Sequence, residues 1–145
     1  MQISQETVYS NVLRDLSRKN NEPEFMQKFR VQSLENFNNL PWPEFKYGKG
    51  IILDARDLDF NVELGSFEIN FKNLNDKIEV LDFKDAFSKH SNFISSNFMS
   101  LIINNEDKFN ALHGALFDIS KLIIIKDNTK LDKPLMIENI FDGSY

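Results

Sequence analysis

The sequence predicts an α+β fold: an N-terminal helical domain with a small β-hairpin, followed by a coil of short stacked strands. Three patterns predict it. Apolar residues recur at spacings of three and four through the first 40 residues, which is typical of helices packed on one side. Near 58–71 apolar residues alternate with polar ones, which is typical of strands. After residue 121 β-branched residues fill short runs, which also favour strands. The predicted domains are 1–117, with the hairpin near 58–71, and 118–145.

Two amphipathic helices are expected at the start of the chain. The first places its apolar residues on one side and Asn11, Arg14 and Arg18 on the other. A second helix is expected to begin at Pro23, whose fixed φ suits a first helical turn, and to stop near Leu40, before Pro41. The apolar side of the first helix consists of Val8, Tyr9, Val12, Leu13 and Leu16.

The predicted hairpin depends on agreement between a turn and a pattern. Gly65 and Ser66 suit a two-residue type II′ turn between two alternating segments. A slip of one residue in the pairing would expose the apolar residues of one strand to solvent, so the register is strongly specified. It places on one face Leu64 opposite Phe67, Val62 opposite Ile69, and Phe60 opposite Phe71.

The rest of the chain is expected to alternate between short elements. Ile78 to Leu81 indicates a strand and Phe83 to Lys89 a short helix. Ser91 and Asn105 are candidate caps of two further helices. The run from Leu122 to Ile125 and the segment from Pro134 to Phe141 are read as extended chain, with a turn at Asp127 and Asn128 in which Asn128 can take a left-handed conformation.

Composition narrows the class of protein. The 145 residues carry a formal charge of −5 and no cysteine. The charge disfavours nucleic acid and anionic membranes as partners. The missing cysteine excludes a disulfide, a thiolate zinc site, a cysteine-held iron–sulfur cluster and a cysteine nucleophile within these residues. Without a signal-peptide pattern or an apolar run near 20 residues, a cytoplasmic protein that does not enter the membrane is expected.

No residue pattern indicates catalysis, cofactor binding or a metal site, and the chain is not expected to be an enzyme. His90 is read as a solvated or capping residue and His113 as a partly buried one bonded to the backbone, because a metal site needs three or four ligands. The acidic residues Asp54, Asp57, Asp59 and Glu63 are read as the solvent side of a strand. The five glycines, Gly48 and Gly50 included, form no phosphate-binding or nucleophile-elbow motif.

Arg30 and Trp42 are the most informative single residues. Arg30 falls inside the apolar arc of the second helix, so its guanidinium needs carboxylates or carbonyls as it is covered, and Glu22 and Glu24 are candidates. The favoured interpretation is an intramolecular brace; the alternative is an arginine that faces a partner. Trp42 either seals the helix exit against the core or anchors a partner, and the first is favoured.

Two stretches resemble the SufB/SufD family of iron–sulfur cluster assembly scaffolds. The first runs from Asn21 through Pro23 and Phe25 to Leu34, with its exit at Leu40 to Pro43. The second runs over 107–117 and continues through 123–125 and 130–135. Ile78 to Leu81, leading into 85–87, is a weaker third match, and the overall spacing is more similar to SufD than to SufB. Asp118 to Lys121 and Lys126 to Asn128 depart from the family's usual turns.

The resemblance implies both a fold and a role. It implies that 118–145 begins a right-handed parallel β-helix whose remainder, with its cluster-related ligands, lies downstream, so no cofactor is expected in this fragment. The implied function is the non-catalytic N-terminal domain of a SufD-like scaffold, whose partners are a SufB-like subunit and a SufC-like ABC ATPase. An uncapped edge at Ile123, Ile125, Leu135 and Ile137 predicts a homodimer or a disordered tail. The alternatives are a free-standing protein-interaction module of unknown partner and, more remotely, a small hydrolase.

Overall fold

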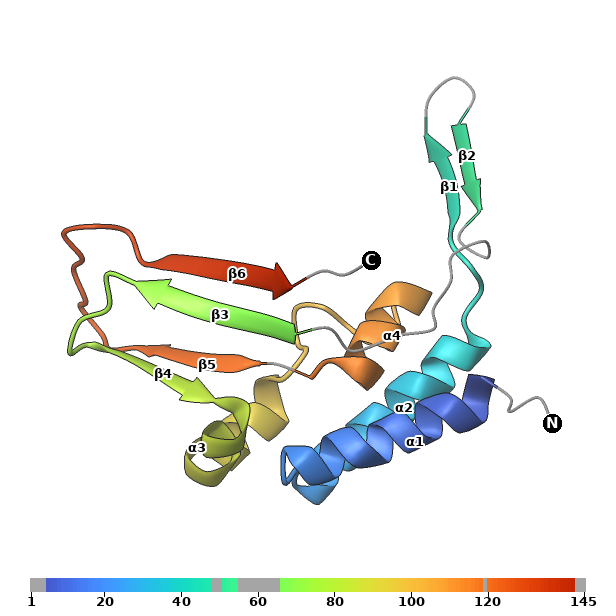
Figure 1. Cartoon of the computed structure of the whole chain (residues 1–145), viewed down its shortest axis with the longest axis horizontal. Helices are drawn as coiled ribbons and strands as arrows, with labels where there is room; N and C mark the ends of the chain where they lie inside the picture. The colour runs from blue at the N-terminus through green and yellow to red at the C-terminus, as the bar shows by residue number, and fades with distance from the viewer. Residues whose placement is uncertain (1–4, 48–50, 55–65, 119, 143–145) are drawn as a thin grey trace.

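The computed structural model describes residues 5–47, 51–54, 66–118 and 120–142. Helices gather on one side of the molecule, and a long two-stranded ribbon extends from them (Figure 1). The helices are α1 (Gln5–Lys19), α2 (Glu24–Asn39), α3 (Phe83–Asn97) and α4 (Lys108–Leu116). The strands are β1 (Glu44–Tyr47), β2 (Ile51–Asp54), β3 (Ser66–Lys72), β4 (Ile78–Asp82), β5 (Lys121–Ile125) and β6 (Met136–Asp142).

The first two helices confirm the sequence prediction. On α1 the residues Tyr9, Leu13 and Leu16 are buried, while Arg14 and Arg18 are exposed. Pro23 is the N-cap of α2 with φ −66°, and Leu40 is its C-cap with an extended backbone. The helix therefore begins and ends where the two prolines allow, since Pro23 needs no amide partner and a helix does not continue into Pro41.

The helices α3 and α4 agree with the prediction in outline, and the N-cap of α4 differs from the predicted one. The chain leaves helical geometry at His90, with φ −132° and ψ 31°, so α3 consists of two helical segments joined at a kink, as the sequence indicated. Asn105 does not cap α4. Asp107 does, because it directly precedes the first helical residue and its carboxylate accepts hydrogen bonds from the amides of Phe109 at 2.7 Å and Asn110 at 2.8 Å.

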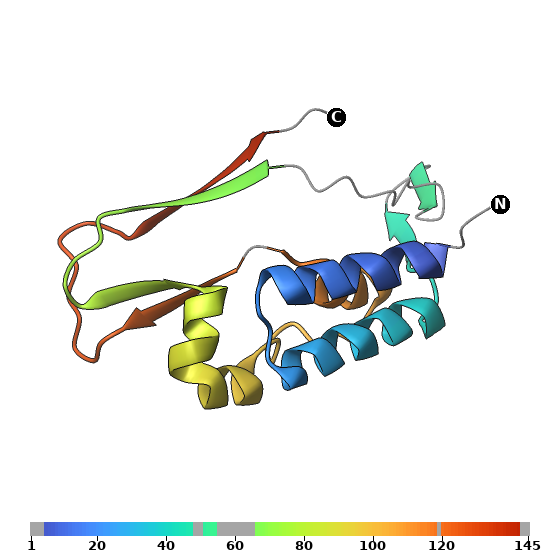
Figure 2. The ribbon, with the colours of Figure 1, turned by 60° about the horizontal axis from the view of Figure 1, so that its bottom comes forward.

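The strands β3 to β6 form a bent antiparallel ribbon. The register is nested, from Asp82 opposite Lys121 out to Ser66 opposite Asp142. The stretch β3–β4 thus runs against β5–β6, and both bend between the two pairings, so the ribbon folds into two layers (Figure 2). Asn73 and Asn128 lie at these bends with φ of 65° and 58°. The left-handed conformation anticipated for Asn128 is confirmed, and asparagine tolerates it better than most residues.

The predicted opening of a right-handed parallel β-helix is wrong. Every strand pair among the described residues is antiparallel, and each of the described sheets has two strands. The physical reason is that a β-branched run such as Leu122 to Ile125 indicates a half-buried strand without specifying the direction of its neighbour. The direction is decided here by the return of the chain from α4 alongside β4.

The predicted hairpin near 58–71 is described only in part. Its second strand is β3, which pairs with β6: Phe67 lies opposite Phe141, with ring centroids 4.7 Å apart, and Phe71 opposite Ile137. The first predicted strand and Gly65 lie outside the described residues, as do Gly48 and Gly50. The segment from Ile123 to Ile137, expected to form a free edge, contributes β5 and the start of β6, both paired inside the chain. Association of two copies stays a prediction.

Two hydrophobic clusters hold the helices together, and α2 contributes to both. One joins α2 to α3, β4 and the end of α4; the other joins α1, α2 and α4. Of the elements packed on α2, α1 runs alongside it in the opposite direction (Figure 1). The first cluster contains Met26, Leu81, Phe83, Ala86, Phe87, Ile94 and Phe117, and the second Tyr9, Leu13, Leu34, Phe37, Ala111 and Ala115.

Candidate functional site

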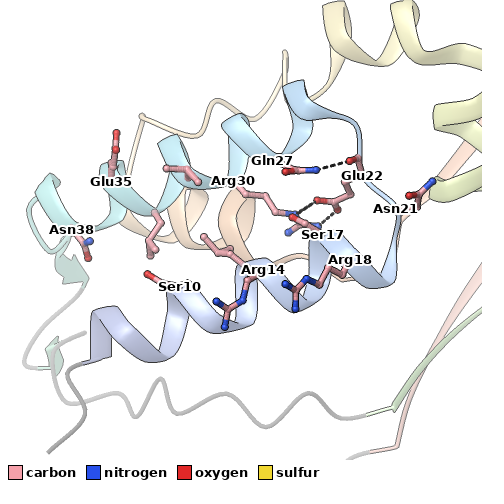
Figure 3. Close-up of a pocket in the computed structure, with 13 residues that line it drawn as sticks. Ser10, Arg14, Ser17, Arg18, Asn21, Glu22, Gln27, Arg30, Glu35 and Asn38 are labelled. Carbon is pink, nitrogen blue, oxygen red and sulfur yellow. Dashed lines mark hydrogen bonds and ion pairs between the residues drawn. The ribbon is translucent and has the colours of Figure 1, made fainter.

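A groove of about 610 Å³ lies between α1 and α2, and we refer to it as the α1–α2 groove. Ser10 and Asn38 lie at one end, and Asn21 and Gln27 at the other (Figure 3). It is lined by Ser10, Leu13, Arg14, Ser17, Arg18, Asn21, Glu22, Gln27, Arg30, Val31, Leu34, Glu35 and Asn38.

A buried ion pair closes the groove at its Asn21 end. Arg30 donates through Nε and Nη2 to the two carboxylate oxygens of Glu22, at 2.8 and 2.6 Å, and both side chains are 0% exposed. Ser17 adds a third donor to the carboxylate at 3.0 Å. The remaining guanidinium nitrogen, Nη1, donates to the backbone oxygen of Ala115 at 2.6 Å, and the guanidinium carbon lies 4.0 Å from the centre of the Phe117 ring.

The predicted intramolecular brace at Arg30 is therefore confirmed with Glu22 as its partner. Glu24 is not a partner. It lies on the outer side of α2 and pairs with Lys28 at 2.7 Å, and the hydrogen bond and charge of Lys28 hold the pKa of Glu24 below its usual value. The alternative of a partner-facing Arg30 does not fit, because the guanidinium is enclosed and its donors are used inside the chain.

The two walls of the groove differ in charge. Arg14 and Arg18 lie one helical turn apart on α1, exposed, and Arg14 donates to Asn11 Oδ1 at 2.8 Å. Neither guanidinium forms an ion pair within the part of the chain that the structure describes. The α2 wall carries Glu35 and the half-exposed Val31. The groove thus has a basic wall, a wall with one acid, and apolar side chains between them.

A second buried cation, Lys108, holds the end of α2. Its Nζ donates to the backbone oxygens of Phe37 and of Leu40, the latter at 2.9 Å, and lies 4.6 Å from the Phe37 ring centre. Burial lowers the pKa of Lys108 below its usual value. Lys108 is not among the residues that the sequence predicted to be buried or functional. Its spacing to Ala111 and Ala115, three and seven residues on, was the available signal, because that spacing places Lys108 on the buried side of α4.

Trp42 packs where the chain leaves α2. Its ring meets Phe37 edge-on at 6.0 Å between centroids and Phe109 at 6.5 Å, beside Lys108 Nζ at 5.0 Å. Trp42 belongs to the cluster formed by α1, α2 and α4. The prediction that Trp42 seals the helix exit against the core is confirmed.

The two histidines do not come together. His90 is half-buried at the kink of α3, while His113 is exposed in the last turn of α4, its ring 6.2 Å from that of Phe117. The expectation of a partly buried His113 is wrong because Ala111 and Ala115 take the buried side of α4, and a residue two positions away points elsewhere. Among the described residues, no group of three or more histidine, aspartate or glutamate side chains is placed to hold a metal ion. Asp57, Asp59 and Glu63 lie outside these residues.

No family model matches the chain. It is nevertheless similar to an iron-sulfur cluster assembly SufBD family protein of Staphylococcus aureus strain USA300, with 25% identity over 175 aligned residues, 91% of this chain and 37% of that protein. The corresponding protein of strain NCTC 8325 matches equally, and that of Staphylococcus saprophyticus is 23% identical over the same span.

These similarities confirm the resemblance to the SufB/SufD family, without distinguishing SufD from SufB. The chain spans 37% of the length of the curated relatives it matches. Because the aligned stretch is longer than the chain itself, the relatives carry insertions within it. None of the described helices is long and apolar enough to span a membrane.

Proposed function

We propose that this chain is a non-catalytic scaffold part of the SUF iron–sulfur cluster assembly machinery, in a SufD-like role in the cytoplasm. The observation that carries the proposal is the similarity of 91% of the chain to proteins named as iron-sulfur cluster assembly SufBD family members. The similarity covers the helices and the ribbon together, so the proposed role belongs to the folded unit as a whole.

The chemistry of the side chains supports a scaffold. Cluster iron is usually held by cysteine thiolates, and the chain contains no cysteine, so the thiolate ligands of a cluster would come from elsewhere. The buried charges serve the fold: Glu22 and Arg30 satisfy each other, and Lys108 is hydrogen-bonded to the end of α2. We therefore propose that no cofactor is held by these residues.

The proposed partners are a SufB-like scaffold subunit and a SufC-like ABC ATPase. A scaffold acts through surfaces held in a fixed arrangement. Here α2 joins the two hydrophobic clusters, which link α1 and α4 to α3 and β4. In this proposal that rigidity lets the chain hold a partner subunit in place.

The test is association with the SUF subunits encoded in the same genome. The purified chain is mixed with the SufB-like subunit, and separately with the SufC-like ATPase, and the mass of each mixture is measured by light scattering after gel filtration. A stable complex with the SufB-like subunit is expected. An unrelated acidic protein of similar mass is the control. Mixtures at about 50 μM would reveal complexes with Kd values near 10⁻⁵ M. The proposal would be overturned if neither subunit forms a complex with the chain at this concentration.

A further inference from the structure

We propose that the α1–α2 groove is the docking site for an amphipathic helix of a partner protein, with acidic residues on the flank that faces α1. The inference deepens the proposed function and rests on it, since the helix is expected on a SUF subunit. It is carried by the length of the groove, by an exposed apolar side chain at its centre, and by the charges of its α1 wall.

The groove is shaped for an elongated ligand. Its lining runs from Gln27 to Asn38 on α2, and from Ser10 to Arg18 on α1 with Asn21 just beyond the end of that helix (Figure 3). On α2 the eleven steps from Gln27 to Asn38, at a rise of 1.5 Å each, extend about 16 Å, which corresponds to about three helical turns. A groove between two helices of this length fits the side of a third helix and its apolar residues at spacings of three and four.

The middle of the groove is apolar and partly uncovered. Val31 is 52% exposed there, beside Leu13 and Leu34, whose buried side chains form the floor. A docked helix would remove Val31 from water while leaving the helix packing below it unchanged. Polar residues occupy both ends, so the apolar contact is confined to the centre, as in interfaces with a polar rim.

The charges of the walls select the ligand. The chain as a whole carries −5, yet the α1 wall presents Arg14 and Arg18 at a spacing of four residues. Two acidic residues at the same spacing on a partner helix would face both guanidinium groups at once. The buried pair of Glu22 and Arg30 adds no net charge, and Glu35 on the α2 wall would favour a basic residue on the helix's other flank.

The absence of cysteine allows a direct test of where a partner binds. Asn38→Cys, at the groove end, and Asn92→Cys, exposed on α3, are each labelled with an environment-sensitive dye and titrated with the purified SufB-like subunit and then the SufC-like ATPase. The dye at position 38 is expected to shift to the blue on binding and the dye at position 92 to stay unchanged. Binding that shifts only the dye at position 92 would overturn the groove assignment.

Charge reversal tests the chemistry of the ligand. Arg14→Glu with Arg18→Glu is expected to weaken binding of the SUF subunit at least tenfold and to reduce its dependence on salt. Lys84→Glu with Lys130→Glu changes the net charge equally at exposed positions outside the groove and is expected to stay within twofold. If circular dichroism shows that the charge reversal unfolds α1, Arg14→Gln with Arg18→Gln replaces it. This neutral pair is expected to give an intermediate loss of binding.

The outcomes separate the two proposals. A subunit that binds the reversed variant as tightly as the unmodified chain would overturn the groove and leave the scaffold role standing. Failure of both subunits to bind would overturn both. A shift of the dye at position 38 with millimolar inorganic phosphate or citrate alone, equal to that with the subunit, would make the groove a small-anion site and would overturn helix docking.

Discussion

Arg30 and Glu22 form a two-point ion pair that is completely enclosed, with donor–acceptor distances of 2.8 and 2.6 Å. It joins the connection between α1 and α2 to the second turn of α2, and the bond from Arg30 to the backbone of Ala115 extends the link to α4. Burying two charges costs solvation that the pairing offsets only when every polar atom is satisfied. Here both nitrogens facing Glu22, the third nitrogen and the carboxylate all have partners.

Replacing Arg30 by methionine is expected to lower the free energy of unfolding by about 3–5 kcal/mol, because Glu22 would be left as an unpaired buried charge. Urea unfolding followed by circular dichroism measures the change. Arg14→Met, at an exposed position on α1, is the control and should change stability by about 0.5 kcal/mol or less. Adding Glu22→Gln to Arg30→Met should recover part of the loss; a loss below about 1 kcal/mol for Arg30→Met alone would contradict this account.

Gly114→Ala is expected to destabilise the contact between α2 and α4. A Cβ at this position would lie 2.9 Å from Ser33 Oγ and 3.3 Å from both Asn104 Cβ and the Phe29 ring. In an open helix the same change would stabilise by about 1 kcal/mol, whereas crowding of a packed contact costs about 1–3 kcal/mol. Thermal unfolding should show a net loss. Ser88→Ala, exposed on α3, should not lower stability, and a gain for Gly114→Ala would show that Ser33 moves aside freely.

Lys108→Met should separate the charge of Lys108 from its packing. Burial lowers the pKa of Lys108, so the unfolded chain binds its proton more tightly than the folded chain does. The stability that Lys108 contributes therefore rises as pH climbs through the lowered folded pKa toward 10.5. The unfolding free energy of the original chain minus that of Lys108→Met should accordingly increase from pH 7 to pH 10. Urea unfolding of both proteins at each pH measures it. A decrease in this difference over the same range would mean that the hydrogen bonds to the two carbonyls raise the pKa of Lys108 more than burial lowers it.

Incubation of the purified chain with ferrous iron and sulfide under anaerobic conditions, followed by desalting, should leave it colourless. No thiolate is present, and no described cluster of carboxylates and imidazoles replaces one. The visible absorption spectrum measures the outcome. Stable absorption that survives desalting would contradict a scaffold without its own cluster, and a cysteine-ligated ferredoxin treated in parallel is the positive control.

Local elements of the helical part could be read from the sequence. Pro23 and Pro41 bound α2, the charged residue inside its apolar arc is the buried Arg30, and the break after Lys89 is the kink at His90. Each of these depends on neighbours within a few turns, where backbone geometry and spacing decide the result. Lys108 was missed because a lysine is assumed to be exposed, although its spacing to Ala111 placed it on the buried side.

By itself, the sequence determined the approximate positions of the four helices and of β3 to β6, which side of α1 and of α2 is buried, and the resemblance to the SufB/SufD family. Only the tertiary structure decided that β3 and β4 run against β6 and β5 in a bent antiparallel ribbon. It also decided that Arg14 and Arg18 line a groove between α1 and α2. The reason is physical: periodicity reports how one segment meets solvent and core, whereas the direction of a pairing strand and the width of a groove depend on segments far away in the chain.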